Sequence, residues 1–129
     1  MRGLTVCQPF ASLIAAGAKP VENRTWPTSY RGALLIHAGK SRKWLGEHVD
    51  VVGLPDPMPF GVVVAVARLH DCRRLEELPS RLRVHEHASG PWCWILRDVA
   101  PLSRPVPWRG ALGLWGVPAE LRRKVRRAA

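Results

Sequence analysis

The stretch Gly17-Ala18-Lys19-Pro20-Val21-Glu22-Asn23-Arg24 places two cations and one anion within six consecutive positions. A helix is expected to end at Gly17, because glycine accepts the left-handed conformation that closes a helix. Pro20 then keeps the residue before it extended. Side chains two positions apart on extended backbone point to the same side. Glu22 and Arg24 are therefore predicted to share one face, where they either form a solvated structural pair or line a cleft beside the helix end.

Short helices and strands are predicted on both sides of this stretch. Apolar residues from Phe10 to Gly17 recur at three-and-four spacing, which predicts a helix, and Pro9 suits its first turn. Apolar or alternating runs predict strands over residues 3–7, 21–26, 32–38, 61–69, 92–99 and 112–117. Further helices are predicted over residues 40–52, 73–83 and 118–129, with proline-rich connections over residues 54–59 and 101–107.

Tryptophan is abundant, with 6 residues in a chain of 129. An indole N–H needs a partner when it is buried, so one or two of these rings are expected to be exposed for stacking. Trp26 is the predicted exposed ring, while Trp44, Trp94 and Trp115 are assigned to the core. In the run 92–99 the residues alternate, and only one of its two faces is expected to be buried throughout.

The element pattern predicts one domain over residues 1–129, with residues 118–129 as a basic C-terminal helix or tail. Strands outnumber helices, and two of them are almost entirely apolar, as buried strands are. Such a set of elements is typical of an α+β fold in which short helices flank a small curved or closed β-barrel.

Charge favours a polyanionic partner. Lys and Arg number 20 against 10 Asp and Glu, which gives a formal net charge of +10. Cations neutralise phosphates and release their counterions, so nucleic acid is the expected partner class. No apolar run has the length of a membrane span, and no signal-peptide layout is seen at the N-terminus, so no membrane association is expected.

No metal or cofactor is expected. Cys7, Cys72 and Cys93 are odd in number and widely spaced, which indicates neither a disulfide framework nor a zinc site and favours the reducing cytoplasm. His85 and His87 are the closest histidine pair, but they stand on a predicted loop without a nearby cysteine. His37 ends an apolar strand and is expected to be a hydrogen-bonded structural residue.

The motif around Lys19 resembles the ASCH domain signature, which reads GxKxxExR. The likeness extends to Gln8-Pro9-Phe10, to the run 30–38, to 61–72, to 90–94 and to 113–115. It implies a PUA-like β-barrel, related to domains that bind RNA or modified bases, with a binding cleft between the first helix and the barrel. The resemblance carries over Lys19, Glu22 and Arg24, with further neighbours at Gln8, Trp26, Tyr30 and Arg31.

Three functions compete at this stage. The first is a nucleic-acid binding module, with RNA or a single strand favoured and DNA also considered, that recognises a nucleotide in this cleft. The second is a small nucleoside- or RNA-processing enzyme, amidohydrolase-like or ribonuclease-like, with Lys19 and Glu22 as candidate catalytic residues. Glu22 stands where acetylcytidine amidohydrolases of similar sequence have threonine. The third is a protein-interaction adaptor that acts through its basic tail. In the structural alternative, Lys19, Glu22 and Arg24 form a buried network that only holds the helix end to the barrel.

Overall fold

A computed structural model describes residues 1–46 and 52–129 of the chain. Its centre is a six-stranded sheet in the order β2-β5-β4-β3-β1-β6, in which β1 and β3 run parallel and the other pairs run antiparallel. The strands are β1 (Arg2–Val6), β2 (Val21–Arg24), β3 (Gly32–Ala38), β4 (Val62–Arg74), β5 (Trp92–Pro107) and β6 (Leu114–Gly116). The helices are α1 (Phe10–Ala15), η1 (Leu75–Glu77), α2 (Ser80–Arg83) and α3 (Ala119–Ala128).

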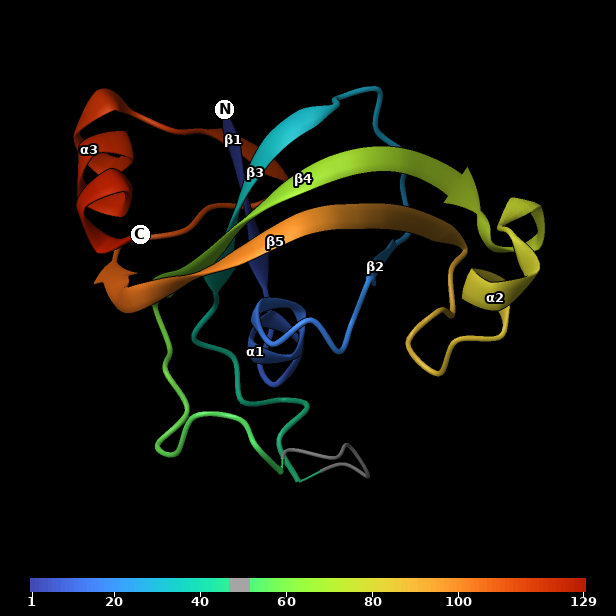
Figure 1. Ribbon diagram of the computed structural model, residues 1–129, viewed down its shortest axis with the longest axis horizontal. Coiled ribbons are helices and arrows are strands. Elements are labelled where there is room, and N and C mark those ends of the chain that lie inside the picture. The colour runs from blue at the N-terminus through green and yellow to red at the C-terminus, as the bar shows by residue number, and fades with distance from the viewer. Residues whose placement is uncertain (47–51) are drawn as a thin grey trace.

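The sheet is strongly curved. The two long strands β4 and β5 lie side by side as bent ribbons, with α2 near one end and α3 near the other (Figure 1). Their pairing register shifts at three places, between Val63 and Ala65, Val66 and Arg68, and Leu69 and Asp71. Extra residues on one strand of a pair bend it and increase its twist. The result is a half-barrel, which confirms the predicted α+β, barrel-like class.

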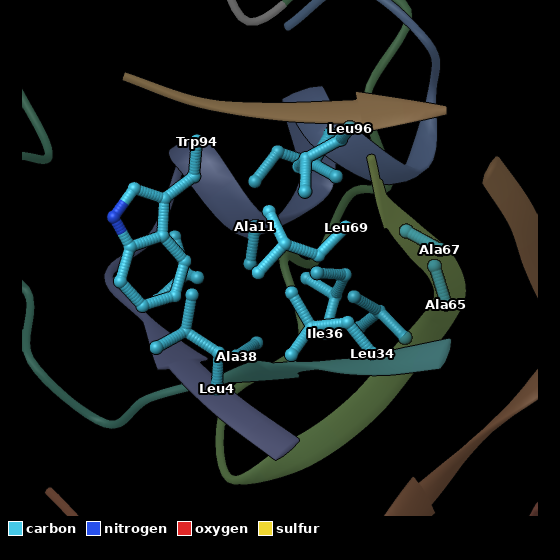
Figure 2. Packing of buried hydrophobic residues seen from close by; sticks show 13 residues of the cluster. Leu4, Ala11, Leu34, Ile36, Ala38, Ala65, Ala67, Leu69, Trp94 and Leu96 are labelled. Atoms are coloured by element: carbon cyan, nitrogen blue, oxygen red, sulfur yellow. The ribbon is translucent and has the colours of Figure 1, made fainter. Parts of the chain in front are cut away.

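The main core fills one face of this sheet beneath α1. Figure 2 shows Leu4 of β1, Ala11 of α1, Ile36 of β3, Leu69 of β4 and Trp94 of β5 packed together, and all five are fully buried. The Trp94 indole N–H donates to the Trp26 carbonyl oxygen at 3.3 Å, which satisfies its donor. Helix α1 packs against the strands through Ala11 and Ile14, which belong to this core.

A second core lies on the opposite face of the sheet, under α3. Leu121 and Val125 of that helix pack with Leu35, Val63 and Val106. Leu35 lies between two β3 residues that face the main core, Leu34 and Ile36, so β3 is buried on both faces as its apolar sequence predicts. The C-terminal basic segment is therefore a packed amphipathic helix, and its arginines are on the outer side.

Three expectations are corrected. Residues 41–46 do not form the first part of a helix, and the rest of the predicted helix over 40–52 lies mainly outside the described residues. Residues 101–107 continue β5 as a strand. Both faces of residues 93–96 are buried, because Trp94 and Leu96 enter the main core while Cys93 and Ile95 join Val21 and Leu78 in a third cluster.

The described residues include no helix with the length and apolar character needed to cross a membrane.

Candidate functional site

The end of α1 delivers Lys19 into the interior. Gly17 adopts a φ of +82°, and the amides of Ala18 and Lys19 both donate to the Leu13 carbonyl, at 3.0 and 3.2 Å. These bonds reverse the chain and place Lys19 under the helix, where only 3% of it is exposed. Its ammonium Nζ donates to the Val21 carbonyl at 2.6 Å and lies 5.6 Å from the Phe10 ring centroid. The lysine is thus held in one place by local backbone geometry.

Glu22 connects the two cations of the motif. Its Oε1 is 3.5 Å from Lys19 Nζ, and its Oε2 is 3.0 Å from Arg24 Nη2. Glu22 and Arg24 therefore share one face of β2, as the alternation of an extended segment predicts. Burial lowers the pKa of the Lys19 ammonium from its ordinary value, and the Glu22 carboxylate opposes that shift. We call these three residues the charged triad.

Arg24 also ties the two sides of the half-barrel together. Its Nη2 donates to the Thr5 carbonyl of β1 at 2.9 Å, although β2 and β1 are separated by three strands in the sheet order. The Nε of Arg24 is buried and has no hydrogen-bond partner among the described residues. Unsatisfied buried donors are rare in folded proteins. Part of this arginine's hydrogen-bonding capacity is therefore not used by the fold.

The charged triad lines an open pocket of about 410 Å³, which we call pocket A. Phe10 and Trp44 form an aromatic side of the pocket, with ring centroids 6.0 Å apart in an edge-to-face contact. Trp44 is 40% exposed, which corrects its assignment to the core. The described residues that line pocket A are Thr5, Val6, Cys7, Phe10, Lys19, Glu22, Asn23, Arg24, Trp44, Glu86, His87 and Ser89.

The other side of pocket A is a loop that Asn23 anchors. The Asn23 amide nitrogen donates to the His87 carbonyl at 2.8 Å, and its oxygen accepts from the amides of Ser89 and Gly90, each at 2.9 Å. Burial, followed by the nearby Lys19 charge, lowers the pKa of His87. An uncharged imidazole is therefore favoured on this wall near neutral pH.

The four predicted neighbours of the triad lie outside the lining of pocket A. Gln8 is fully buried, where its amide bonds the Ser12 hydroxyl at 2.8 Å and the Pro59 carbonyl at 2.9 Å. Tyr30 donates its hydroxyl to the Ala33 carbonyl at 2.6 Å. Arg31 is on the surface, 3.3 Å from Asp71. Trp26 is exposed, as predicted, but its ring packs on Trp94 with centroids 4.9 Å apart.

Sequence reasoning missed several lining residues for different reasons. Asn23 lies inside the quoted motif, and its position between Glu22 and Arg24 signals that it faces the opposite side of β2. Trp44 and His87 come from loops that only the folded chain brings to the helix end, so no local pattern marks them. His37 is confirmed as a structural histidine, since its Nε2 bonds the Trp108 carbonyl at 2.7 Å and burial lowers its pKa.

The chemistry of pocket A suits a flat, polar, uncharged group. Among the described residues, its lining carries the cations of Lys19 and Arg24 together with the carboxylates of Glu22 and Glu86, so their formal charges balance. Exposed aromatic edges offer apolar contact, and the carboxylate and guanidinium offer an acceptor and donors. No cluster of three or more His, Cys, Asp or Glu residues that could hold a metal ion is found in the described part of the chain.

Comparison with known proteins places the chain among ASCH domains. The family model for the ASCH domain matches residues 4–105. The chain is 25% identical over 130 residues to the Homo sapiens protein named Activating signal cointegrator 1 and 24% identical to the Mus musculus protein of that name. Each match covers 92% of this chain and 22% of the relative, so the chain spans about a fifth of the length of these curated relatives.

Solved structures share the fold. The crystal structure of ASCH from Zymomonas mobilis superposes with a TM-score of 0.62 at 16% identity, covering 98% of this chain and 93% of that one. A serine-to-alanine mutant of the same Zymomonas mobilis protein gives a TM-score of 0.60, with coverage of 98% and 94%. At this level of identity the likeness concerns the PUA-like architecture.

Proposed function

This chain belongs to the ASCH domain family, and we propose that it is a nucleic-acid binding module that holds one base of a single-stranded RNA or DNA in pocket A. RNA is the favoured ligand because the PUA-like fold is related to domains that bind RNA or modified bases. Three free cysteines suit a reducing compartment such as the cytoplasm.

The convergence of the charged triad on an open, aromatic-lined pocket is the observation that carries this proposal. A base offers a flat face for contact with Trp44 and an edge with donors and acceptors for Glu22 and Arg24. The formal charge balance of pocket A favours a base over a phosphate as its occupant. The net charge of +10 supplies the long-range attraction to the rest of the strand.

Two exposed tryptophans provide a matched test. Trp44 is 40% exposed and lines pocket A, whereas Trp26 is 36% exposed and lies outside its lining. Binding of a fluorophore-labelled eight-nucleotide single-stranded RNA, measured by fluorescence anisotropy, is expected to weaken roughly tenfold in Trp44→Ala, because one stacked base contributes about 1–3 kcal/mol. The Trp26→Ala variant is expected to bind within about twofold of the unaltered chain.

The proposal fails if the unaltered chain does not bind RNA or DNA at low salt. It also fails if Trp26→Ala and Trp44→Ala weaken binding equally, since pocket A would then have no special role. Replacement of the labelled RNA by a duplex of the same length is a further control, because a paired base cannot enter the pocket without being unstacked.

An enzymatic role is the second candidate, and the electrostatics of Lys19 favour it. A buried lysine with a lowered pKa, 3.5 Å from a carboxylate in an open pocket, is a pattern found at catalytic sites. Such an enzyme requires Lys19 and Glu22 to act on a modified nucleoside or an RNA linkage. Product formation from acylated nucleosides or structured RNA that disappears in a folded Glu22→Gln variant supports this role, and the absence of product above blank eliminates it.

A further inference from the structure

A second hollow, which we call pocket B, adjoins pocket A. It has a volume of about 830 Å³ and lies where the C-terminal ends of β3 and β5 approach β1. The residues that matter for the argument are Thr5, His37, Lys40, Trp108, Arg109 and Leu112, all of which line it. None of the three triad residues lines pocket B, and neither does any other residue of the motif 17–24.

The two pockets share Thr5 as a common wall. The Thr5 carbonyl accepts the Arg24 hydrogen bond in pocket A, while its hydroxyl lies 3.2 Å from His37 Nδ1 in pocket B. Thr5 therefore lines both hollows, and the two hollows are neighbours.

Pocket B carries positive charge that no described carboxylate pairs. Lys40 and Arg109 line it, both cations are exposed, and no Asp or Glu is among the described residues of its lining. Within residues 1–46 and 52–129, neither cation has a carboxylate at ion-pair distance. The Lys40 side chain lies along Gly61, with Cε 3.0 Å from the place where a Cβ would stand. In pocket A, by contrast, Glu22 already pairs both cations of the triad.

The wall of pocket B is held firmly. His37 Nε2 bonds the Trp108 carbonyl at 2.7 Å, and the Trp108 amide donates to the Gly61 carbonyl at 3.2 Å. Gly110 packs so closely on Thr5 and His37 that a Cβ there would lie 2.7 Å or less from both side chains. A pre-formed wall loses little entropy when a ligand binds.

Trp108 connects pocket B to the basic face of α3. Its ring is half-buried, and Lys124 Nζ of α3 lies 5.8 Å from the ring centroid. Trp108 thus lies beside a helix whose exposed side carries Arg122, Arg123, Lys124, Arg126 and Arg127. Cations and aromatic rings in succession are typical of grooves that follow a single strand.

We propose that pocket B is a second subsite, which binds the phosphate and neighbouring nucleotide of a single-stranded nucleic acid whose adjacent base occupies pocket A. This inference rests on the proposed function of pocket A. It makes the ligand an oligonucleotide, with Lys40 and Arg109 on its phosphates and Trp108 beside its next base. A single nucleoside fills only half of the site.

The test compares two pairs of surface cations. Lys40→Gln/Arg109→Gln removes two charges from pocket B, and Arg68→Gln/Arg97→Gln removes two exposed charges that face each other across β4 and β5, outside both pockets. Each double variant is titrated with a labelled eight-nucleotide RNA, its DNA counterpart and the four unphosphorylated nucleosides, at several salt concentrations. Circular dichroism confirms that each variant is folded.

The pocket B variant is expected to lose roughly tenfold in oligonucleotide affinity at 50 mM salt. Its salt slope should fall by about 1.4, since each phosphate contact with a single strand contributes about 0.7. Nucleoside binding should change less than about twofold, because a free nucleoside carries no phosphate and is held by pocket A. The Arg68 and Arg97 variant should keep most of its affinity and its salt slope.

Equal losses in the two double variants overturn this inference alone, since net charge would then explain them. An unchanged salt slope in the pocket B variant also overturns it, while the Trp44 result still stands for pocket A. If the unaltered chain binds no oligonucleotide, the proposed function and this inference fail together. The RNA and DNA arms show which strand the site prefers.

Discussion

Replacing Glu22 by glutamine removes the carboxylate that both Lys19 and Arg24 contact, at 3.5 and 3.0 Å. The Lys19 side chain is only 4% exposed, so its charge stays buried without its partner. Breaking a buried ion pair on one side costs about 3–5 kcal/mol. The glutamine oxygen still accepts one hydrogen bond, and Arg24 is partly exposed, so we expect the free energy of unfolding to fall by about 2–3 kcal/mol at pH 7.

The pH dependence of that loss identifies its cause. The folded-state pKa of Lys19 is lowered, so the unfolded chain binds more protons between that pKa and the ordinary value of 10.5. The contribution of Lys19 to the free energy of unfolding is therefore greatest above pH 10.5. It decreases as the pH falls from 10.5 to the lowered pKa. Without the Glu22 carboxylate the folded pKa falls further. The stability gap between Glu22→Gln and the unaltered chain should therefore shrink between pH 7 and pH 9.5.

Urea unfolding followed by tryptophan fluorescence measures both quantities. Asp71→Asn is the matched control, because Asp71 also contacts two arginines, Arg31 and Arg73, but on the surface, and should cost about 1 kcal/mol or less. Adding Lys19→Met to Glu22→Gln should recover stability and remove the pH dependence of the gap. The reasoning is refuted if Glu22→Gln is within about 0.5 kcal/mol of the unaltered chain, or if the gap is equal at both pH values.

Three other predictions concern the surroundings of the two pockets. Leu121→Ala should lower the free energy of unfolding by about 2–4 kcal/mol in urea titrations, because this fully buried leucine fixes α3 to the sheet; a change below 1 kcal/mol would mean that α3 is loosely attached. Asn23→Ala should speed amide hydrogen exchange at residues 87–90 at least tenfold, since three hydrogen bonds to that loop are lost, and unchanged exchange would contradict the anchoring role. Because the pKa of His37 is lowered in the folded state, the unfolded state binds the proton first as the pH falls. The free energy of unfolding should therefore decrease below about pH 6.5, and His37→Asn should make that decrease less steep. An equally steep decrease in the variant would assign the effect to another group.

The charged triad could be predicted from sequence because its geometry is local. A glycine that ends a helix, a proline and an extended segment fix the directions of Lys19, Glu22 and Arg24 within a few residues. The same holds for β3, whose continuous apolar sequence required burial on both faces and whose bounds, Gly32–Ala38, match the prediction.

The remaining features depend on contacts between distant parts of the chain. Residues 101–107 are a strand despite their prolines, because β2 pairs only with Trp92–Ile95 of β5 and leaves the second half of β5 at an edge, where a missing N–H is tolerated. Trp44 lines pocket A because its ring meets Phe10, the first residue of α1 and 34 positions earlier in the chain. Gln8 was predicted to contact a ligand, but its side-chain amide donates a hydrogen bond to the Pro59 carbonyl, 51 positions away in the chain.

The central claim, that pocket A receives a base, is tested most directly by following the backbone amide and indole N–H resonances while an eight-nucleotide single-stranded RNA is added. We predict that the largest and earliest shifts occur at the Trp44 indole and at the amides of Lys19 and residues 21–24, with smaller shifts at residues 108–112. Shifts confined to residues 119–128, with the Trp44 indole unmoved, would contradict the account, because the strand would then bind the outer face of α3 alone.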